Sequence, residues 1–600
     1  MVEPEGTAPH EPHLDLLRRY EPVLTYNEGE RFFPVGVEDY VRCCGLWQGE
    51  EQLVPAGELT TERLVATARR YPESRLSLLL VRDPFDRSET RRYTRTRRPS
   101  IAKSGRLAAV GLIARVFDVL LRASLFLRGS VPGGVAAAAA DLYERRMSPA
   151  RCAYYGRVVR EGGYVVLQYW FLYAMNDWRT TFAGVNDHEG DWEAVTVYLA
   201  DTADGPRPAW VAVSAHDGTG DDLRRRWDDP DLRIVDEHPV LFVGAGSHSG
   251  AFVPGQYLVT VNPARLRPVL RGTRRVTAFA FPWLRQGRRH GGVGIPFIDY
   301  AMGDGEQVGP GRTRTWHPAV ISDETPWVSG FHGLWGRDTR DWVGGERAPA
   351  GPRYERDGRV RTLWADPLGW AGLQKILPDP EDVHRELRAR IAILDNEIED
   401  ADAGIGRNRE ELRRLRATAV SLGRHESARG LARRRAAEVA KAEADLRELV
   451  RTRTDLTEER AAHEATLAGP ADEEEPHEHL REPHVPYTPS RGSRTRFLHV
   501  WAALSTPLFL LALVGVFLVP HEPVVILLAA VVFLFAAMES WARRRMLALA
   551  TCLLTLVGAV AVVAGLGLAV MYGGRYVLLV PMVAVAAVLL VVNLRELFHR

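Results

Sequence analysis

The chain has 600 residues, which is too long for one hydrophobic core, so several domains of about 100–200 residues each are expected. Its 77 Lys and Arg residues nearly balance its 76 Asp and Glu residues, and the net charge of +1 gives no overall field that would favour nucleic acid as a partner. The four cysteines show no disulfide framework, and the N-terminus shows no basic-then-apolar signal peptide, so we expect a protein that stays in a reducing compartment.

Residues 1–162 predict an N-terminal part that contains both helices and strands. Helices are expected over Leu14–Tyr20 and around Thr60–Arg70. A strongly basic run, Arg87–Arg106, precedes the apolar segment Leu107–Leu127, which carries three charged residues. Each such charge costs about 2.5–3.5 kcal/mol at the centre of a bilayer, so this segment predicts a helix packed on the domain. A helix at the surface of an anionic membrane is the alternative.

Residues 163–376 predict a β-rich part of the same soluble domain. Apolar and aromatic runs punctuated by Gly and Pro are typical of an antiparallel β-sandwich. The expected strands are Tyr164–Met175, Trp210–His216, Pro239–Val243, Gln256–Val261 and Val276–Ala280. The fold class predicted for the soluble domain is therefore β-rich and antiparallel β-sandwich-like, with N-terminal helical additions.

The densest chemical signal is the motif His188-Glu-Gly-Asp-Trp-Glu193, which opens a further predicted strand. If the strand begins by Glu189, the carboxylates of Glu189, Asp191 and Glu193 point to one face, where they repel one another unless a cation neutralises them. Hard cations such as Ca²⁺ and Mg²⁺ take oxygen ligands. We therefore predict that His188, Glu189, Asp191 and Glu193 bind a divalent cation, with Ca²⁺ or Mg²⁺ favoured over Zn²⁺. A solvated acidic loop is the alternative.

Two more histidines lie at the ends of predicted strands, where loops on a rigid sheet often build functional sites. His216 follows one strand, and His248 lies in the turn that follows another. If these strand ends converge on the acidic motif, His216 and His248 are candidates for the general base and acid of a metal-assisted reaction. A structural role for each histidine is the alternative.

Short motifs distributed over residues 14–370 carry a family resemblance. In chain order they are Tyr20-Glu-Pro-Val-Leu, Glu30-Arg-Phe-Phe-Pro, Gln168-Tyr-Trp, Asn176-Asp-Trp178, His188-Glu-Gly-Asp-Trp-Glu193, His238-Pro-Val, Gly246-Ser-His248 and Trp364-Ala-Asp-Pro367. With them the chain resembles the vacuolar protein sorting-associated protein 62 family and its bacterial relatives. This resemblance implies no particular reaction.

The acidic motif is also similar, more distantly, to the Gly-His-Arg-His-Asp-Trp-Glu motif of necrosis-inducing-like proteins. Those proteins are secreted β-sandwich cytolysins that bind a divalent cation and sphingolipid headgroups. The similarity implies that His188, Asp191 and Glu193 lie near a cation, in a site for a headgroup or another ligand. Glu-Gly stands where that family has Arg-His, and no export signal is visible, so a toxin role is not expected.

Residues 380–468 are rich in Glu, Arg and Ala, and apolar residues recur at alternating spacings of four and three from Leu387 to Leu422. This heptad pattern, followed by a glycine-bounded break and a weaker second seam, predicts an antiparallel α-helical coiled-coil hairpin. An intermolecular coiled coil, and hence self-association, is the alternative. Residues 469–496 predict a solvated linker, in which His477, His479 and His484 could instead bind metal.

Residues 497–600 predict four transmembrane helices, each near the length that crosses a bilayer. The expected spans are Phe497–Val519, Val524–Ser540, Met546–Met571 and Tyr576–Asn593. Arginines precede the first span, follow the fourth and separate the second from the third, whereas the other links carry only Arg575. By the positive-inside rule, both termini lie in the cytoplasm of a multi-pass protein of the cell membrane.

These patterns support three functional hypotheses. The first is a cytoplasm-facing binding module that is anchored in the lipid bilayer and holds a divalent cation together with a ligand or lipid headgroup. The second is a metal-dependent hydrolase that acts at the membrane surface. The third is a membrane scaffolding or remodelling protein. Whether the chain is an enzyme stays open at this level, and nucleic acid is not an expected partner.

Overall fold

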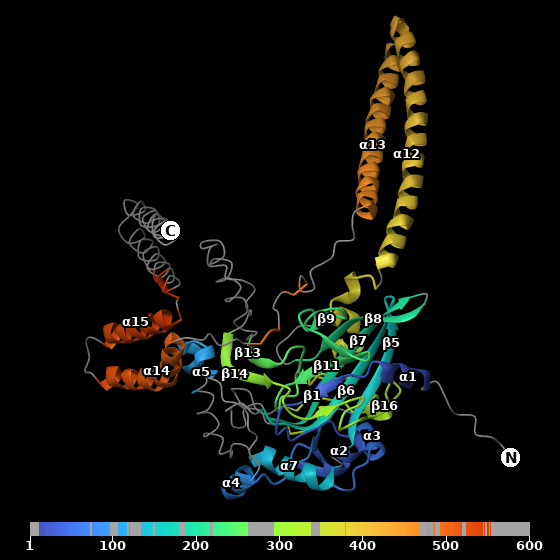
Figure 1. Cartoon of the computed structure of the whole chain (residues 1–600). Helices are drawn as coiled ribbons and strands as arrows, with labels where there is room; N and C mark the ends of the chain where they lie inside the picture. Colours follow the sequence, from blue (N-terminus) through green and yellow to red (C-terminus); the bar gives the residue numbers. More distant parts are fainter. Residues whose placement is uncertain are drawn as a thin grey trace, which may run out of the picture.

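The computed structural model confirms a multidomain chain with β-sheets, a long helical region and apolar helices (Figure 1). The structure describes residues 11–72, 75–96, 106–116, 119, 134–147, 151–178, 187–202, 204–215, 220–261, 293–337, 348–378, 380–468, 477, 479–480, 484–486, 493–518, 524–543, 545–546, 549–550 and 553.

A six-stranded sheet forms the centre of the β-rich domain, in the order β16-β5-β6-β7-β8-β9. Its strands are β5 (Cys152–Glu161), β6 (Tyr164–Asn176), β7 (His188–Thr202), β8 (Gly205–Val213), β9 (Arg224–Arg226) and β16 (Trp316–Val320). The two longest, β6 and β7, are antiparallel neighbours and are buried along almost their whole length, as their aromatic and β-branched composition predicts. The β5–β6 pair joins residues on both sides of the boundary at 162/163 into one folding unit.

A five-stranded sheet covers one face of the central sheet. It contains β1 (Val23–Thr25), β10 (Arg233–Val235), β11 (His238–Val243), β12 (Gly250–Ala251) and β15 (Gln307–Val308). Its inward side chains pack against alternate residues of β6 and β7, so the two sheets share one core. The arrangement is a sandwich, but β1–β11 and β5–β16 pair in parallel, and each of these pairs joins segments that are far apart in the sequence. The expectation of a purely antiparallel sandwich is wrong at these two pairs.

Helices and a small sheet cover the other face of the central sheet. They are α2 (Val37–Cys43), α3 (Thr61–Arg70), α7 (Gly134–Arg146), β2 (Gly45–Gln48), β3 (Glu51–Val54) and β4 (Leu76–Leu79). The core on this side includes Trp192 of β7, which contacts the rings of Trp327 and Trp335. The smaller elements of the domain are α1 (Glu11–Arg19), α4 (Arg87–Thr96), α5 (Arg106–Ala109), β13 (Gly255–Val261), β14 (Val293–Ala301), α9 (Pro326–Gly330), α10 (Thr362–Ala365), α11 (Pro367–Trp370) and η2 (Leu373–Lys375).

Two long helices, α12 (Pro380–Gly423) and α13 (Arg429–Ala468), project from the domain side by side (Figure 1). A short 3-10 helix, η3 (Glu426–Ala428), lies between them. Ion pairs join the start of α12 to the end of α13, as between Arg390 and Glu459 at 2.8 Å, and the late part of α12 to the early part of α13, as between Arg416 and Glu443 at 2.6 Å. The two helices are therefore antiparallel.

The linker does not behave as a fully solvated tether at the residues that the structure describes. His477 and His479 contact the loops and strands around β9, and the side chain of Leu480 is buried. The imidazole of His484 stacks on the ring of Tyr257 in β13, with 4.3 Å between the ring centroids. The chain thus returns from α13 to the surface of the β-rich domain before it reaches the apolar helices.

Two described helices, α14 (Ser493–Leu518) and α15 (Val524–Ala542), are long and apolar enough to cross a membrane. They coincide with the first two predicted spans, and many of their large apolar side chains are exposed, among them Leu511, Phe517 and Val525. Exposed apolar surface of this kind is expected where lipid is the solvent. The predicted spans Met546–Met571 and Tyr576–Asn593 lie almost entirely outside the described residues.

A buried ion pair connects the N-terminal part to this apolar helix pair. Arg115, which is 1% exposed, donates to the carboxylate of Glu539 in α15 at 2.7 Å and to the hydroxyl of Ser505 in α14 at 3.0 Å. The Trp501 indole N–H and the Arg543 guanidinium also donate to Glu539. Arg115, one of the three charged residues in the apolar segment 107–127, thus has a buried partner 424 positions away in the sequence.

The carboxyl group of Glu21, between α1 and β1, gives the domain a pH-dependent stability. Burial raises its pKa to about 7, against the hydrogen bond that the Tyr154 hydroxyl donates to it. A raised folded-state pKa means that the contribution of Glu21 to stability is complete below its unfolded pKa and is lost as the pH rises through about 7. We expect Glu21→Gln to raise the free energy of unfolding by about 1–2 kcal/mol at pH 8 and by much less at pH 5. Denaturant unfolding of both proteins at the two pH values measures this, and an equal difference at both would contradict it.

Candidate functional site

The acidic motif forms the first six residues of β7, and the backbone conformation of Gly190 sets the direction of its side chains. Gly190 has a φ of 65°, in the left-handed region that favours glycine. The carboxylates of Asp191 and Glu193 lie opposite Tyr173 and Phe171 and share their face, whereas Glu189 turns to the face that carries Trp335. The expectation that all three carboxylates share one face is therefore wrong for Glu189, because Gly190 interrupts the regular alternation.

The Glu189 carboxylate is bound by the backbone of two other segments. It accepts N–H groups from Val81 at 2.8 Å, from Leu80 at 3.3 Å and from Arg337 at 3.2 Å. Burial raises its pKa, while these N–H groups and the charge of Arg337 lower it. In this structure Glu189 ties β7 to the end of β4 and to the loop before residue 338, and its oxygens are turned away from those of Asp191 and Glu193.

Asp191 is held by two histidines. His248 Nδ1 lies 2.9 Å from one carboxylate oxygen, and His188 Nε2 lies 3.8 Å from the other. The His248 imidazole, which is 2% exposed, also stacks on the ring of Tyr173 at 3.7 Å with only 4° between the planes. His248 therefore positions the Asp191 carboxylate from the side that faces away from the cavity, and stacking on Tyr173 holds the His248 ring in one orientation.

Glu30 completes the surroundings of His248 on the opposite side. One of its oxygens lies 4.0 Å from His248 Nε2, an atom that has no hydrogen-bond partner among the described residues. The Glu30 carboxylate accepts backbone N–H groups from Arg31 at 2.7 Å and from Gly246 at 3.0 Å. His248 itself has a φ of 57°, which is uncommon for a residue with a side chain. The His248 imidazole thus lies between the carboxylates of Asp191 and Glu30.

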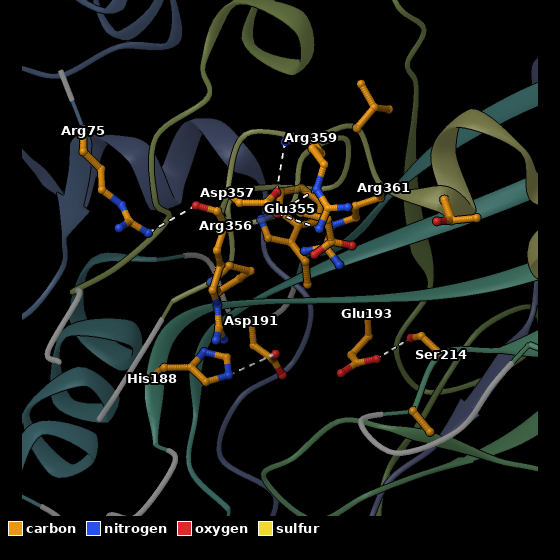
Figure 2. A pocket seen from close by; sticks show the side chains of 15 residues that line it. Arg75, His188, Asp191, Glu193, Ser214, Glu355, Arg356, Asp357, Arg359 and Arg361 are labelled. Carbon is orange, nitrogen blue, oxygen red and sulfur yellow. Dashed lines mark hydrogen bonds and ion pairs between the residues drawn. The ribbon is translucent and has the colours of Figure 1, made fainter. Parts of the chain in front are cut away.

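The front of Asp191 faces a cavity of about 790 Å³ (Figure 2). One wall carries the acidic motif residues His188, Asp191 and Glu193, together with Ser214, whose hydroxyl donates to Glu193. The other wall is rich in arginine and comes from Arg75 and the loop before α10. Its charged residues are Arg75, Glu355, Arg356, Asp357, Arg359 and Arg361.

The two walls interact electrostatically. Burial lowers the pKa of Arg361, and the negative charges of Glu355, Glu193 and Asp191 oppose this effect. Arg361 Nε donates to the carbonyls of Gly351 and Tyr354, both at 3.1 Å, which anchors the loop beside the acidic wall. The cavity therefore offers carboxylates on one side and guanidinium groups on the other, a combination that suits an anionic ligand held together with a cation.

The predicted metal ligands are gathered only in part. Within the described part of the chain, the one set of three His, Cys, Asp or Glu residues whose ligand atoms all lie within 4.8 Å of one another is Asp229, Asp231 and His477, outside this cavity. At the acidic motif, Asp191 and His188 approach each other, Glu193 contacts Ser214, and Glu189 lies on the other face. A cation here would take Asp191 and His188 and complete its shell with Glu193, water or ligand oxygens.

The structure tests the prediction for only one of the two strand-end histidines, His248. His216 lies outside the described residues. His248 does contact Asp191, as convergence of the strand ends predicts, but it does not line the cavity. It is placed to position Asp191 rather than to touch a ligand.

The sequence reasoning missed the arginine wall and Glu30. Three arginines within the six residues of Arg356–Arg361 form a visible charge cluster, but nothing in a single sequence places that cluster opposite Asp191. Comparison with models of protein families finds no match, and comparisons with curated proteins and with solved structures find none either. The site is therefore interpreted from its own geometry.

Proposed function

We propose that the β-rich domain is a membrane-anchored binding module, which takes up a divalent cation and an anionic ligand, such as a lipid headgroup, in the cavity of the acidic motif. The observation that carries this proposal is the pairing of Asp191, Glu193 and His188 on one wall with arginines on the other. Phosphate or carboxylate oxygens of the ligand would contact the guanidinium groups and share the cation with Asp191. Oxygen ligands favour Ca²⁺ or Mg²⁺ over Zn²⁺.

The anchor in this proposal is the C-terminal region. Four spans, with both termini in the cytoplasm, would place the cavity on the cytoplasmic side of the cell membrane; the helices α14 and α15 support the first two of these spans. We further propose that α12 and α13 act as a coiled-coil hairpin. Their apolar side chains that remain exposed, such as Ile393, Val420 and Leu431, offer a surface for self-association, which sedimentation of the detergent-solubilised chain with and without residues 380–468 would test.

The binding proposal predicts a loss of cation affinity when Asp191 is neutralised. In calorimetry on the full-length chain in detergent, Asp191→Asn should weaken Ca²⁺ or Mg²⁺ binding at least about tenfold, because a charged ligand is lost. The matched control is Asp204→Asn, on the exposed turn between β7 and β8, which should leave affinity unchanged. Full affinity in Asp191→Asn would contradict the cation site.

The ligand half of the proposal is tested with vesicles. Full-length chain in nanodiscs should bind vesicles that contain a phosphoinositide, in a cation-dependent manner, and the double variant Arg356→Ala/Arg359→Ala should lose most of this binding. Arg207→Ala is the control, since that arginine is exposed near the start of β8 and lies outside the arginine wall. Equal binding by all three proteins would exclude the arginine wall as the headgroup site.

A hydrolase remains the second candidate, favoured by the Asp191–His248 hydrogen bond at 2.9 Å. Such a pair orients a carboxylate that could activate water on a bound cation. The same vesicle samples distinguish the two functions. Steady release of phosphate or of a soluble headgroup, lost in Asp191→Asn, would support the hydrolase, and binding without release would support the module.

A further inference from the structure

The turn between β9 and β10 carries two aspartates that face the linker. Asp229 is buried, with a fully covered side chain, and its Oδ1 accepts the backbone N–H of Asp231 at 2.8 Å. From the linker, His477 places Nε2 at 3.0 Å from Asp229 Oδ1 and at 3.3 Å from Asp231 Oδ2. Residues separated by about 250 positions in the sequence thus bring three ligand atoms together.

We propose that Asp229, Asp231 and His477 form a zinc-class metal site that fastens the linker to the β-rich domain. For a tetrahedral ion with bonds of about 2.0–2.1 Å, neighbouring ligand atoms are roughly 3.3 Å apart. The two distances from His477 Nε2 are close to this value, and all three ligand atoms lie within 4.8 Å of one another. Three protein ligands leave one position for water.

A second observation at the site is an unsatisfied carboxylate oxygen. Asp229 Oδ2 is buried and has no hydrogen-bond partner among the described residues. Its ion pair with Arg225 Nε, at 4.0 Å, is longer than a hydrogen bond, so a cation bound at the same carboxylate would offset part of the cost of burying this oxygen.

The charge balance at the site also permits a divalent ion. Arg225 is the positive charge nearby, with its Nε 4.0 Å from Asp229 and 3.8 Å from Asp231, and other N–H groups of its guanidinium donate to the carbonyls of Asp222 and Arg224. The two carboxylates and this guanidinium together carry a net charge of −1, which still attracts a divalent cation. One imidazole with two carboxylates suits Zn²⁺ or Mn²⁺ better than Ca²⁺, which prefers a shell made entirely of oxygen.

Two linker residues close to His477 already pack on the β-rich domain. Next to His477, Leu480 is buried and the His479 imidazole contacts the edge of Trp210, with 5.5 Å between the ring centroids. Burial lowers the pKa of His479 to about 4, so it stays neutral against the domain at physiological pH. A metal ion bound by His477 would add a coordination bond to these packing contacts. The linker that leads to α14 would then be held against the β-rich domain.

The experiment uses the full-length chain in detergent, stripped with a chelator and then titrated with ZnCl₂. We expect saturable binding that is at least tenfold weaker in His477→Ala and in Asp231→Asn, and protection of residues 469–493 from protease when zinc is present. His479→Ala is the matched linker control and should keep the zinc affinity, because its ring contacts the backbone and an indole but is not a ligand.

Three outcomes decide the proposal. Zinc affinity and protection that depend on His477 and Asp231 support it. Zinc affinity that is unchanged in His477→Ala overturns it, as does a protease pattern in the unsubstituted chain that does not respond to zinc, which would leave only an ion pair between the imidazolium and the carboxylates. Asp191→Asn should retain this zinc binding, so failure here is distinct from failure of the cavity site.

Discussion

Replacing Gly190 with alanine is expected to destabilise the β-rich domain by at least about 3 kcal/mol. The backbone at this position is left-handed, with a φ of 65°, and a Cβ would overlap the carbonyl oxygen of Trp335. Strain and steric overlap therefore act together, and relief would require β7 to separate from the segment that carries Trp335. Thermal unfolding followed by tryptophan fluorescence measures the loss.

The control for this prediction is Gly57→Ala. Gly57 also has a left-handed backbone, with a φ of 89°, but a Cβ there meets no atom within 4 Å. This substitution tests backbone strain alone and should cost about 1–2 kcal/mol. Equal destabilisation by the two substitutions would show that the contact with Trp335 is not what makes Gly190 necessary.

Removing the Arg115 side chain is expected to cost about 2–3 kcal/mol, because the Glu539 carboxylate, buried beside α14, then keeps only Trp501 and Arg543 as donors among the described residues. The measurable result is easier thermal unfolding in detergent and faster proteolysis around residues 106–116. The double variant Arg115→Met/Glu539→Gln should recover much of the loss, since both charges are then absent. Arg145→Ala is the control, because its pair with Asp141 on α7 is largely exposed and should contribute less than about 1 kcal/mol.

If Arg115→Ala unfolded like the unsubstituted chain, the contact between this segment and the apolar helices would not contribute to stability. A destabilised Arg115→Ala that the double variant failed to rescue would indicate a packing role for the arginine stem. Rescue by the double variant would therefore indicate that the loss comes from the unpaired charge, and failure of rescue would indicate that it comes from lost packing.

Local patterns in the sequence predict the elements that depend on neighbours in the chain. The helices near residues 14–20 and 60–70, the strands β6 and β11, the two long helices and the first two apolar helices all follow from periodicity or composition. In each case, the residues that stabilise the element lie within a few turns or along one strand, so the pattern is visible locally.

The features that the sequence did not predict depend on contacts between distant segments. The parallel pairing of β1 with β11 joins residues 217 positions apart at Val23 and Val240, and no local signal encodes that partner. Likewise, the regular alternation of a strand puts Glu189 on the face of Asp191 and Glu193, and only the left-handed backbone of Gly190 in the folded chain shows that it lies on the other face. The arginine wall is equally a product of chain topology.

The antiparallel course of α12 and α13 has a mechanical consequence. At about 1.5 Å per residue, the 44 residues of α12 carry the tip between the helices roughly 65 Å outward, yet the chain comes back to where it left. Heptads could be added to or removed from both helices in matched pairs, which would change that reach without altering the distance from the cavity to α14. The reach of the arm and the separation between the cavity and α14 are thus independent variables in this molecule. A longer or shorter arm would change what the tip can touch and leave that separation unchanged.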